Sequence, residues 1–149
     1  MKLVLFGGIP ILVGYVYNLV IANASVPWMS LGFLFLVLWG GLGYIVSSLD
    51  KKPLIQAFKL CLIGIIMIIM TSFQSIVSGG YFFNILGSMP QYYFLPIAQL
   101  TMRITNNFTD SRLIIFVIEW IVLFAISYIG CYLKQLTRNR HVKREKNDV

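Results

Sequence analysis

The uncharged stretch LVLFGGIPILVGYVYNLVIANASVPWMSLGFLFLVLWGGLGYIVSSL, residues 3–49, decides the class of this protein. A helix that crosses the hydrocarbon core of a bilayer needs about 20 apolar residues, because each residue adds about 1.5 Å and the core is about 30 Å thick. Residues 3–49 are therefore long enough for two spans and a tight turn. A second uncharged stretch follows at residues 60–102. The sequence predicts an integral membrane protein of the all-α class.

The composition of the chain agrees with this class. Of its 149 residues, 58% are hydrophobic and 11% are charged. Soluble domains carry about 25% charged residues, so a water-exposed surface is not expected. The net charge is +7, but six of the twelve basic residues lie in residues 134–149, and others flank the apolar stretches. Basic residues beside spans are topology determinants, so nucleic acid is not an expected partner.

A bundle of four transmembrane helices is expected, at about residues 3–22, 26–49, 60–78 and 113–133. The first span contains Gly7, Gly8 and Pro10 and is expected to be kinked, because proline removes a backbone donor and clashes with the preceding turn. Residues 1–133 then form the membrane domain. Residues 134–149 form a basic cytoplasmic tail.

Residues 79–107 combine helix breakers and amides with many aromatic side chains. Aromatic residues favour the membrane–water interface. The segment is expected to be interfacial or re-entrant, lying over the outer ends of the helices, and a fifth span is the alternative. The positive-inside rule argues against a fifth span. With four spans, ten of the twelve basic residues lie inside and only Arg103 and Arg112 lie outside. Both termini are then cytoplasmic, and the plasma membrane is the expected location.

A few polar side chains fall inside the predicted spans, and Glu119 is the only carboxylate among them. Counted from the predicted helix ends, Asn18, Ser30 and Gln74 lie about 6 Å deep and Glu119 about 9 Å deep in the outer leaflet. Ionisable residues inside membranes usually face a protein interior or a watery cavity. The four side chains are expected to form one polar layer. This layer either holds the helices in register or lines a pocket for a ligand, an ion or a partner helix.

Glycines are frequent in the first two predicted spans, and small residues let helix backbones approach closely in lipid. Gly7 and Gly8 lie near the inner end of the first span, and Gly40, Gly41 and Gly43 lie towards the inner end of the second. These levels roughly match in an antiparallel hairpin. Contact between the two helices is expected, with a self-association face as the alternative.

Sequence motifs for catalysis are missing. HExxH, Walker A and GxSxG patterns do not occur, and the single histidine, His141, lies in the charged tail. Cys61 and Cys131 have no spacing typical of a metal site or a disulfide framework. No enzymatic activity, metal or other cofactor is therefore expected.

The leading hypothesis is a small non-enzymatic membrane protein that binds a partner, as a regulator or an accessory subunit of a membrane complex. It rests on the small size, the missing catalytic motifs, the glycines and the basic tail. The expected partners are the lipid bilayer, anionic lipid headgroups at the tail, and another membrane protein or a second copy of the chain. The alternative is a small oligomeric transporter or channel that uses Glu119 and the polar layer.

Overall fold

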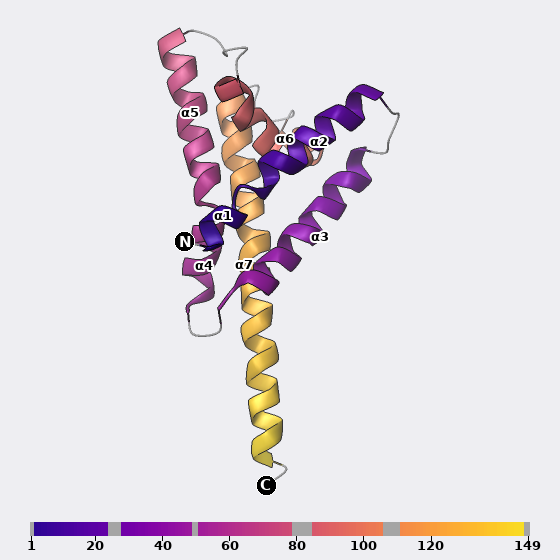
Figure 1. Ribbon diagram of the computed structural model, residues 1–149, viewed down its shortest axis with the longest axis vertical. Helices are drawn as coiled ribbons and strands as arrows, with labels where there is room; N and C mark the ends of the chain where they lie inside the picture. Colours follow the sequence, from indigo (N-terminus) through magenta and orange to yellow (C-terminus); the bar gives the residue numbers. More distant parts are fainter. Residues whose placement is uncertain (1, 24–27, 49–50, 79–84, 106–110, 148–149) are drawn as a thin grey trace.

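The computed structural model describes residues 2–23, 28–48, 51–78, 85–105 and 111–147, and every regular element in these ranges is a helix (Figure 1). The all-α prediction is confirmed for them. The helices, in chain order, are α1 (Lys2–Phe6), α2 (Ile9–Asn23), α3 (Trp28–Val46), α4 (Pro53–Leu60), α5 (Leu62–Ser78), α6 (Ile85–Thr105) and α7 (Arg112–Asn147).

Three segments are long and apolar enough to cross a membrane: Leu3–Val20, Met29–Val46 and Leu113–Arg138. They coincide with three of the four predicted spans. The helices α4 and α5 meet at an angle of 44° and satisfy the same criteria only as a pair. The described part of the chain therefore has three helices compatible with a membrane, or four if this bent pair crosses as one span.

The helical course is interrupted twice, between α1 and α2 and between α4 and α5, and the two interruptions lie next to each other. Between α1 and α2, the amide of Gly8 donates to the carbonyl of Leu5 and the amide of Ile11 donates to that of Gly8, both tight i→i+3 turns. Between α4 and α5, the amide of Gly64 donates to the carbonyl of Cys61 in the same way. The third predicted span differs from the observed element, because the helical course begins at Pro53 and bends at Cys61.

The segment that was expected to lie over the outer helix ends contains a helix within the bundle. Its helix α6 has 21 residues, includes Pro90 and Pro96, and contacts α2, α3, α5 and α7. Tyr93, Phe94 and Ile97 on α6 are fully buried. An interfacial layer over the helix ends does not describe these residues, and the re-entrant alternative stays a prediction. Neighbouring helices can protect the backbone groups that proline leaves without partners, so the prolines do not prevent a helix here.

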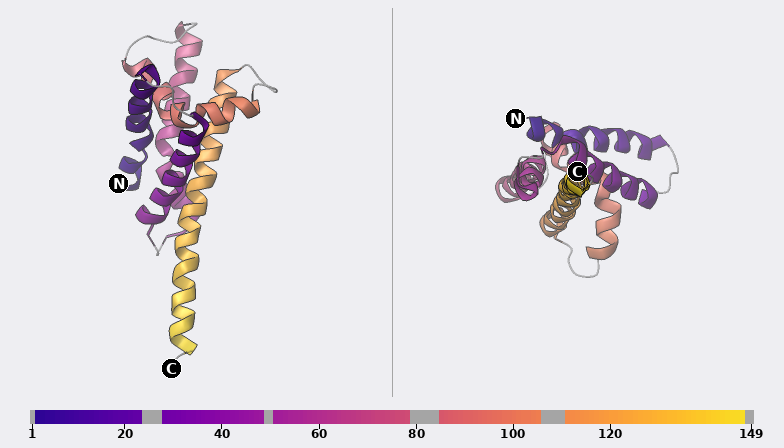
Figure 2. Two further views of the ribbon diagram at one scale, coloured as in Figure 1. Left: turned by 90° about the vertical axis from the view of Figure 1, so that its right-hand side faces the viewer. Right: turned by 90° about the horizontal axis from the view of Figure 1, so that it is seen from below.

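α6 runs across the bundle in the half of the molecule that holds the C-terminal end of α5 and the N-terminal end of α7 (Figure 2). It packs into the core of buried apolar side chains. This core consists of Phe35, Trp39, Leu60, Cys61, Met67, Tyr93, Phe94, Ile97 and Leu123. The indole Nε1 of Trp39 donates a hydrogen bond of 3.1 Å to the carbonyl of Leu123 and so joins α3 to α7.

α7 is a continuous helix of 36 residues, about 54 Å long. It passes the predicted helix end at residue 133 without a break and continues to Asn147. Its C-terminal part extends beyond the other helices (Figure 1). Residues 134–147 of the predicted tail are therefore part of the last helix.

Candidate functional site

The carboxyl group of Glu119 lies fully buried on α7. Its Oε1 atom accepts a hydrogen bond of 2.6 Å from the Oγ1 hydroxyl of Thr101 on α6. Its Oε2 atom has no hydrogen-bond partner among the residues that the structure describes. A buried polar atom without a partner costs free energy, because it has lost its hydrogen bonds to water. One oxygen of the buried carboxyl group is therefore bonded, and the other is not.

Thr101 is the partner that the sequence did not predict. It lies near the end of α6, where its Oγ1 atom is also 3.1 Å from the carbonyl oxygen of Ala98. Thr105, one turn further on, donates to the carbonyl of Thr101. Thr101 and Thr105 are one helical turn apart, and this spacing is the signal that could have identified the polar side of α6.

The predicted polar layer of four side chains does not form. Glu119 and Gln74 are buried, and the Oε1 atom of Gln74 has no hydrogen-bond partner. Asn18 and Ser30 lie at exposed positions on α2 and α3. The physical reason is the position of α6, which contacts both α2 and α7 and places Thr101 beside the carboxyl group.

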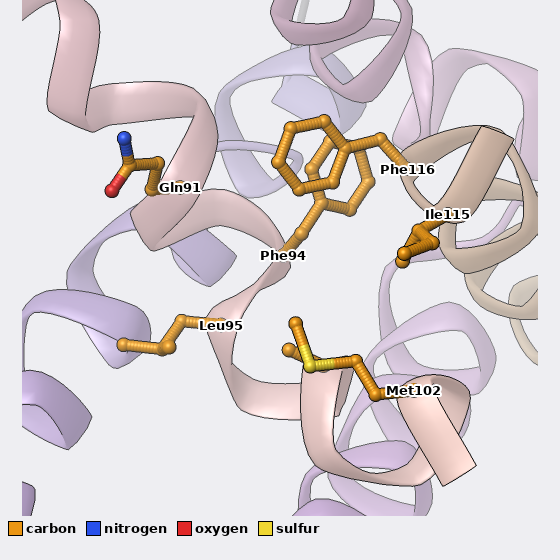
Figure 3. Close-up of a pocket in the computed structure, with 7 residues that line it drawn as sticks. Gln91, Phe94, Leu95, Met102, Ile115 and Phe116 are labelled. Carbon is orange, nitrogen blue, oxygen red and sulfur yellow. The ribbon is translucent and has the colours of Figure 1, made fainter. Parts of the chain in front are cut away.

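A pocket lies between α6 and α7, next to the Thr101–Glu119 pair, with a cavity volume of about 230 Å³ (Figure 3). The rings of Phe94 and Phe116 stack on its wall, with centroids 4.9 Å apart. Ile115 lies one helical turn before Glu119, and Ala98 lies three residues before Thr101. Neither Thr101 nor Glu119 is among the residues that line the pocket. The lining residues are Gln91, Phe94, Leu95, Ala98, Met102, Ile115 and Phe116.

The predicted packing glycines contact other helices than expected. A Cβ atom on Gly7 would lie 2.3 Å from the carbonyl oxygen of Leu60, and one on Gly8 would lie 3.7 Å from Ile63. These glycines thus pack on α4 and α5 and not on α3. Gly40 and Gly43 pack on α7, where a Cβ atom on Gly43 would lie 2.9 Å from the carbonyl oxygen of Ser127.

Where α3 and α7 cross, the surface of the bundle has a groove. Gly41 lines this groove, and a Cβ atom on Gly41 would have no atom within 4 Å. The groove has a volume of about 560 Å³. Its lining residues, all apolar apart from the Tyr44 hydroxyl, are Phe33, Leu36, Val37, Gly40, Gly41, Tyr44, Ile126, Ile129, Gly130 and Leu133. We call this feature the α3–α7 groove.

Polar side chains join the helices at the end where α3 stops. The buried carboxamide of Gln56 accepts a hydrogen bond from the amide of Ser48 and donates to the carbonyls of Ser48 and Lys51, at 2.8 and 2.9 Å. The ammonium group of Lys134 donates to the carbonyls of Ile45 and Ser47. Cations near helix C-termini satisfy the last carbonyls and favour the helix dipole. These bonds fasten the end of α3 to α4 and α7.

Cys61 and Cys131 are both buried free thiols. Within the described ranges, no group of three or more His, Cys, Asp or Glu residues is arranged to hold a metal ion. No protein family model, curated protein or solved structure matches the chain.

Proposed function

We propose that this chain is a small, non-enzymatic plasma-membrane protein that binds a transmembrane helix of a partner protein in the α3–α7 groove, as a regulator or accessory subunit. The observation that carries this proposal is Gly41, a glycine at the surface with open space in front of it. Glycines in the other half of the same crossing bring α3 and α7 together. Gly41 takes no part in that contact, so another helix can approach it closely.

The shape and chemistry of the α3–α7 groove support this occupant. Helix association in lipid depends on van der Waals contact, because lipid tails are as apolar as leucine, and small residues let a second backbone approach closely. The groove is lined by three glycines, Gly40, Gly41 and Gly130, and by larger side chains that include Phe33 and Leu133. A helix with small residues of its own would fit between these side chains.

The groove test compares two positions on α3 that are equally exposed. Val37 and Ile45 are each 72% exposed, but only Val37 lines the groove. A photo-crosslinking amino acid at Val37, in native membranes, is expected to give a discrete adduct whose peptide is a transmembrane segment of another protein. The same probe at Ile45 is expected to give only diffuse lipid adducts.

A bulky side chain in the groove provides the matched control. Gly41→Trp should abolish the Val37 adduct, since the indole would occupy the groove and the added Cβ atom would meet no atom within 4 Å. Leu38→Trp, on the same helix but outside the groove, should leave the adduct unchanged. Equal adducts at Val37 and Ile45, or an adduct that persists in Gly41→Trp, would argue against the proposal. An adduct with this chain itself would identify a second copy as the occupant.

The proposed topology has four spans, counting α4 and α5 as one bent span, with both termini in the cytoplasm. It is supported by the direction of the helices. The C-terminal end of α3 and the start of α4 lie on the side towards which α7 extends, and α5 ends on the opposite side (Figure 1). On this assignment, Lys51, Lys52 and the basic C-terminal segment share the cytoplasmic side, as the positive-inside rule requires.

Cysteine labelling in a background without Cys61 and Cys131 tests this topology. Asn106→Cys is expected to react with an impermeant thiol reagent added to intact cells, because α6 ends at Thr105 and α7 begins at Arg112 on the side that the proposed topology assigns to the exterior. Asn139→Cys is expected to react only after the membrane is permeabilised. Labelling of Asn139→Cys in intact cells would refute the arrangement with both termini inside.

A further inference from the structure

Arg103 and Arg112 are the two basic residues that the proposed topology leaves on the outer side, against the trend of the positive-inside rule. Both are close in sequence to residues that line the α6–α7 pocket. Arg103 directly follows Met102, and Arg112 begins α7 one turn before Ile115 and Phe116. At about 100° per residue, residue 112 shares the face of α7 that carries residues 115 and 116. The two arginines therefore flank the outer end of the pocket.

The charge at this end of the molecule favours an anionic ligand. The side chain of Arg103 is exposed, and no hydrogen bond or ion pair joins it to another residue that the structure describes. Asp110 is the only acidic residue between residues 60 and 118, so the two arginines outweigh it. Arginine binds phosphate groups well, because its planar guanidinium group donates two parallel hydrogen bonds. A phosphate group at the membrane surface matches this charge.

The pocket itself suits a hydrocarbon chain. Its lining is apolar apart from the amide of Gln91 (Figure 3). Gln91 and Met102 are exposed, so the pocket opens to the surroundings of the bundle. Its volume of about 230 Å³ exceeds that of a cavity of about 150 Å³ that holds benzene. One turn of a helix about 10 Å across occupies about 400 Å³. The pocket therefore has room for part of an acyl chain and not for a helix.

We propose that the α6–α7 pocket holds one acyl chain of an anionic phospholipid, whose phosphate group binds Arg103 and Arg112. The chain contacts Phe94, Leu95 and Phe116 in the lining. A phospholipid fits better than a soluble phosphate compound, because the positive charge and the apolar cavity are adjacent and a lipid matches both. The inference rests on the proposed topology, but it does not depend on the α3–α7 groove or on a partner helix.

The test compares two methionines that are almost equally exposed. Met102 is 40% and Met29 is 38% exposed, but only Met102 of the two lines the pocket. The protein carries ¹³C-labelled methionine methyl groups and is placed in phosphatidylcholine nanodiscs with a small fraction of lipid that has a nitroxide on one acyl chain. The nitroxide relaxes the NMR signals of the methyl groups that it approaches. Because the label is on the chain, a free phosphate ion gives no signal.

Nitroxide-labelled phosphatidylglycerol is expected to relax Met102 at least about fivefold more than labelled phosphatidylcholine, since one basic residue near the surface raises the occupancy of an anionic lipid about fivefold. Met29 should show no such preference. Equal relaxation of Met102 by the two lipids would overturn the proposal. The same preference at Met29 would overturn it as well, because anionic lipid would then be enriched around the whole protein.

Two double variants test the headgroup site. Arg103→Gln with Arg112→Gln should remove the preference for phosphatidylglycerol at Met102. Lys51→Gln with Lys52→Gln removes the same charge at the other end of the bundle (Figure 1) and should leave the preference unchanged. A preference that persists in the arginine variant would overturn the proposal, and so would its loss in the lysine variant.

Ala98→Phe tests the site of the chain. Ala98 lines the pocket, so the added ring should fill it and lower the relaxation of Met102 to that of Met29, although both arginines remain. Relaxation of Met102 that stays at the wild-type value would place the chain elsewhere and overturn the proposal. Gel filtration establishes that each variant is folded, and if Ala98→Phe does not fold, the comparison with Met29 still tests the pocket. Labelling of Asn106→Cys tests the topology separately, so a failure of the lipid site is distinguishable from a failure of the topology.

Discussion

Gly130→Ala is expected to push α3 and α7 apart and to lower the free energy of unfolding by about 3 kcal/mol, the upper part of the usual range for overpacking. A Cβ atom at this position would lie 2.1 Å from the carbonyl oxygen of Gly40 and 3.0 Å from its carbonyl carbon. Both are backbone atoms, so no side chain can rotate away. Trp39 reports the separation, because its indole is bonded across the same helix pair. Its fluorescence during unfolding in mixed micelles, isolated by replacing Trp28 and Trp120 with phenylalanine in both proteins, measures the loss.

Gly41→Ala is the matched control for this substitution. It adds the same methyl group to the helix on the other side of the crossing, at a position with no atom within 4 Å. Its effect on the free energy of unfolding should stay within about 0.5 kcal/mol, as for most surface substitutions. If both variants lost the same stability, the cost would come from the helices themselves and not from the close approach of α3 and α7.

Gln56→Leu is expected to cost about 3 kcal/mol, since leucine has a similar size but no hydrogen-bonding atoms. The carboxamide of Gln56 is fully buried and bonds the amide and carbonyl of Ser48 and the carbonyl of Lys51. The partly buried amide and carbonyl of Ser48 would lose this partner, at about 1–3 kcal/mol for each group that water does not reach, whereas the carbonyl of Lys51 keeps its bond from Gln135. The same mixed-micelle titration measures the change. Proteolysis between α3 and α4 should also become faster, because Gln56 fastens the end of α3.

Gln135→Leu serves as the comparison for Gln56. Its carboxamide also bonds the carbonyl of Lys51, at 2.7 Å, but in an exposed position. Water can replace this bond, so the substitution should cost less than about 1 kcal/mol. Equal losses for the two glutamines would mean that burial of the Gln56 carboxamide is not what stabilises the connection.

The long apolar helices could be predicted from the sequence because charge is excluded from lipid. Residues 3–49 contain no charge, and two helices compatible with a membrane lie within them. The same argument misplaced the start of the third helical course. The predicted third span begins at residue 60, directly after Lys59, yet α4 includes Lys59, whose side chain is exposed while Gln56 and Ala57 are buried on the same helix.

The candidate site was less predictable, because depth along a helix can be counted but direction around its axis cannot. The residue count from the predicted helix ends places Asn18 and Gln74 near the depth of Glu119. Their orientation depends on which helix packs on which, and the sequence does not show that α6 packs on both α2 and α7. Thr101 bonds Glu119 because α6 packs against α7. Glycines show the same limit, since Gly7 and Gly43 each make a close contact with a helix other than the predicted one.

In the proposed topology, the unbroken course of α7 joins the bilayer to the aqueous phase through a single helix. Gly130, where α3 crosses it, lies 17 residues before Asn147, a distance of about 25 Å along the axis. A tilt of about 10° around this crossing would displace the far end by about 4 Å at that length. Lys134 resists such a tilt, because it ties α7 to the last carbonyls of α3 just past the pivot. An occupant of the α3–α7 groove would contact α7 near this crossing. A tilt of α7 that it caused would displace the basic end of the chain most, because that end lies farthest from the crossing.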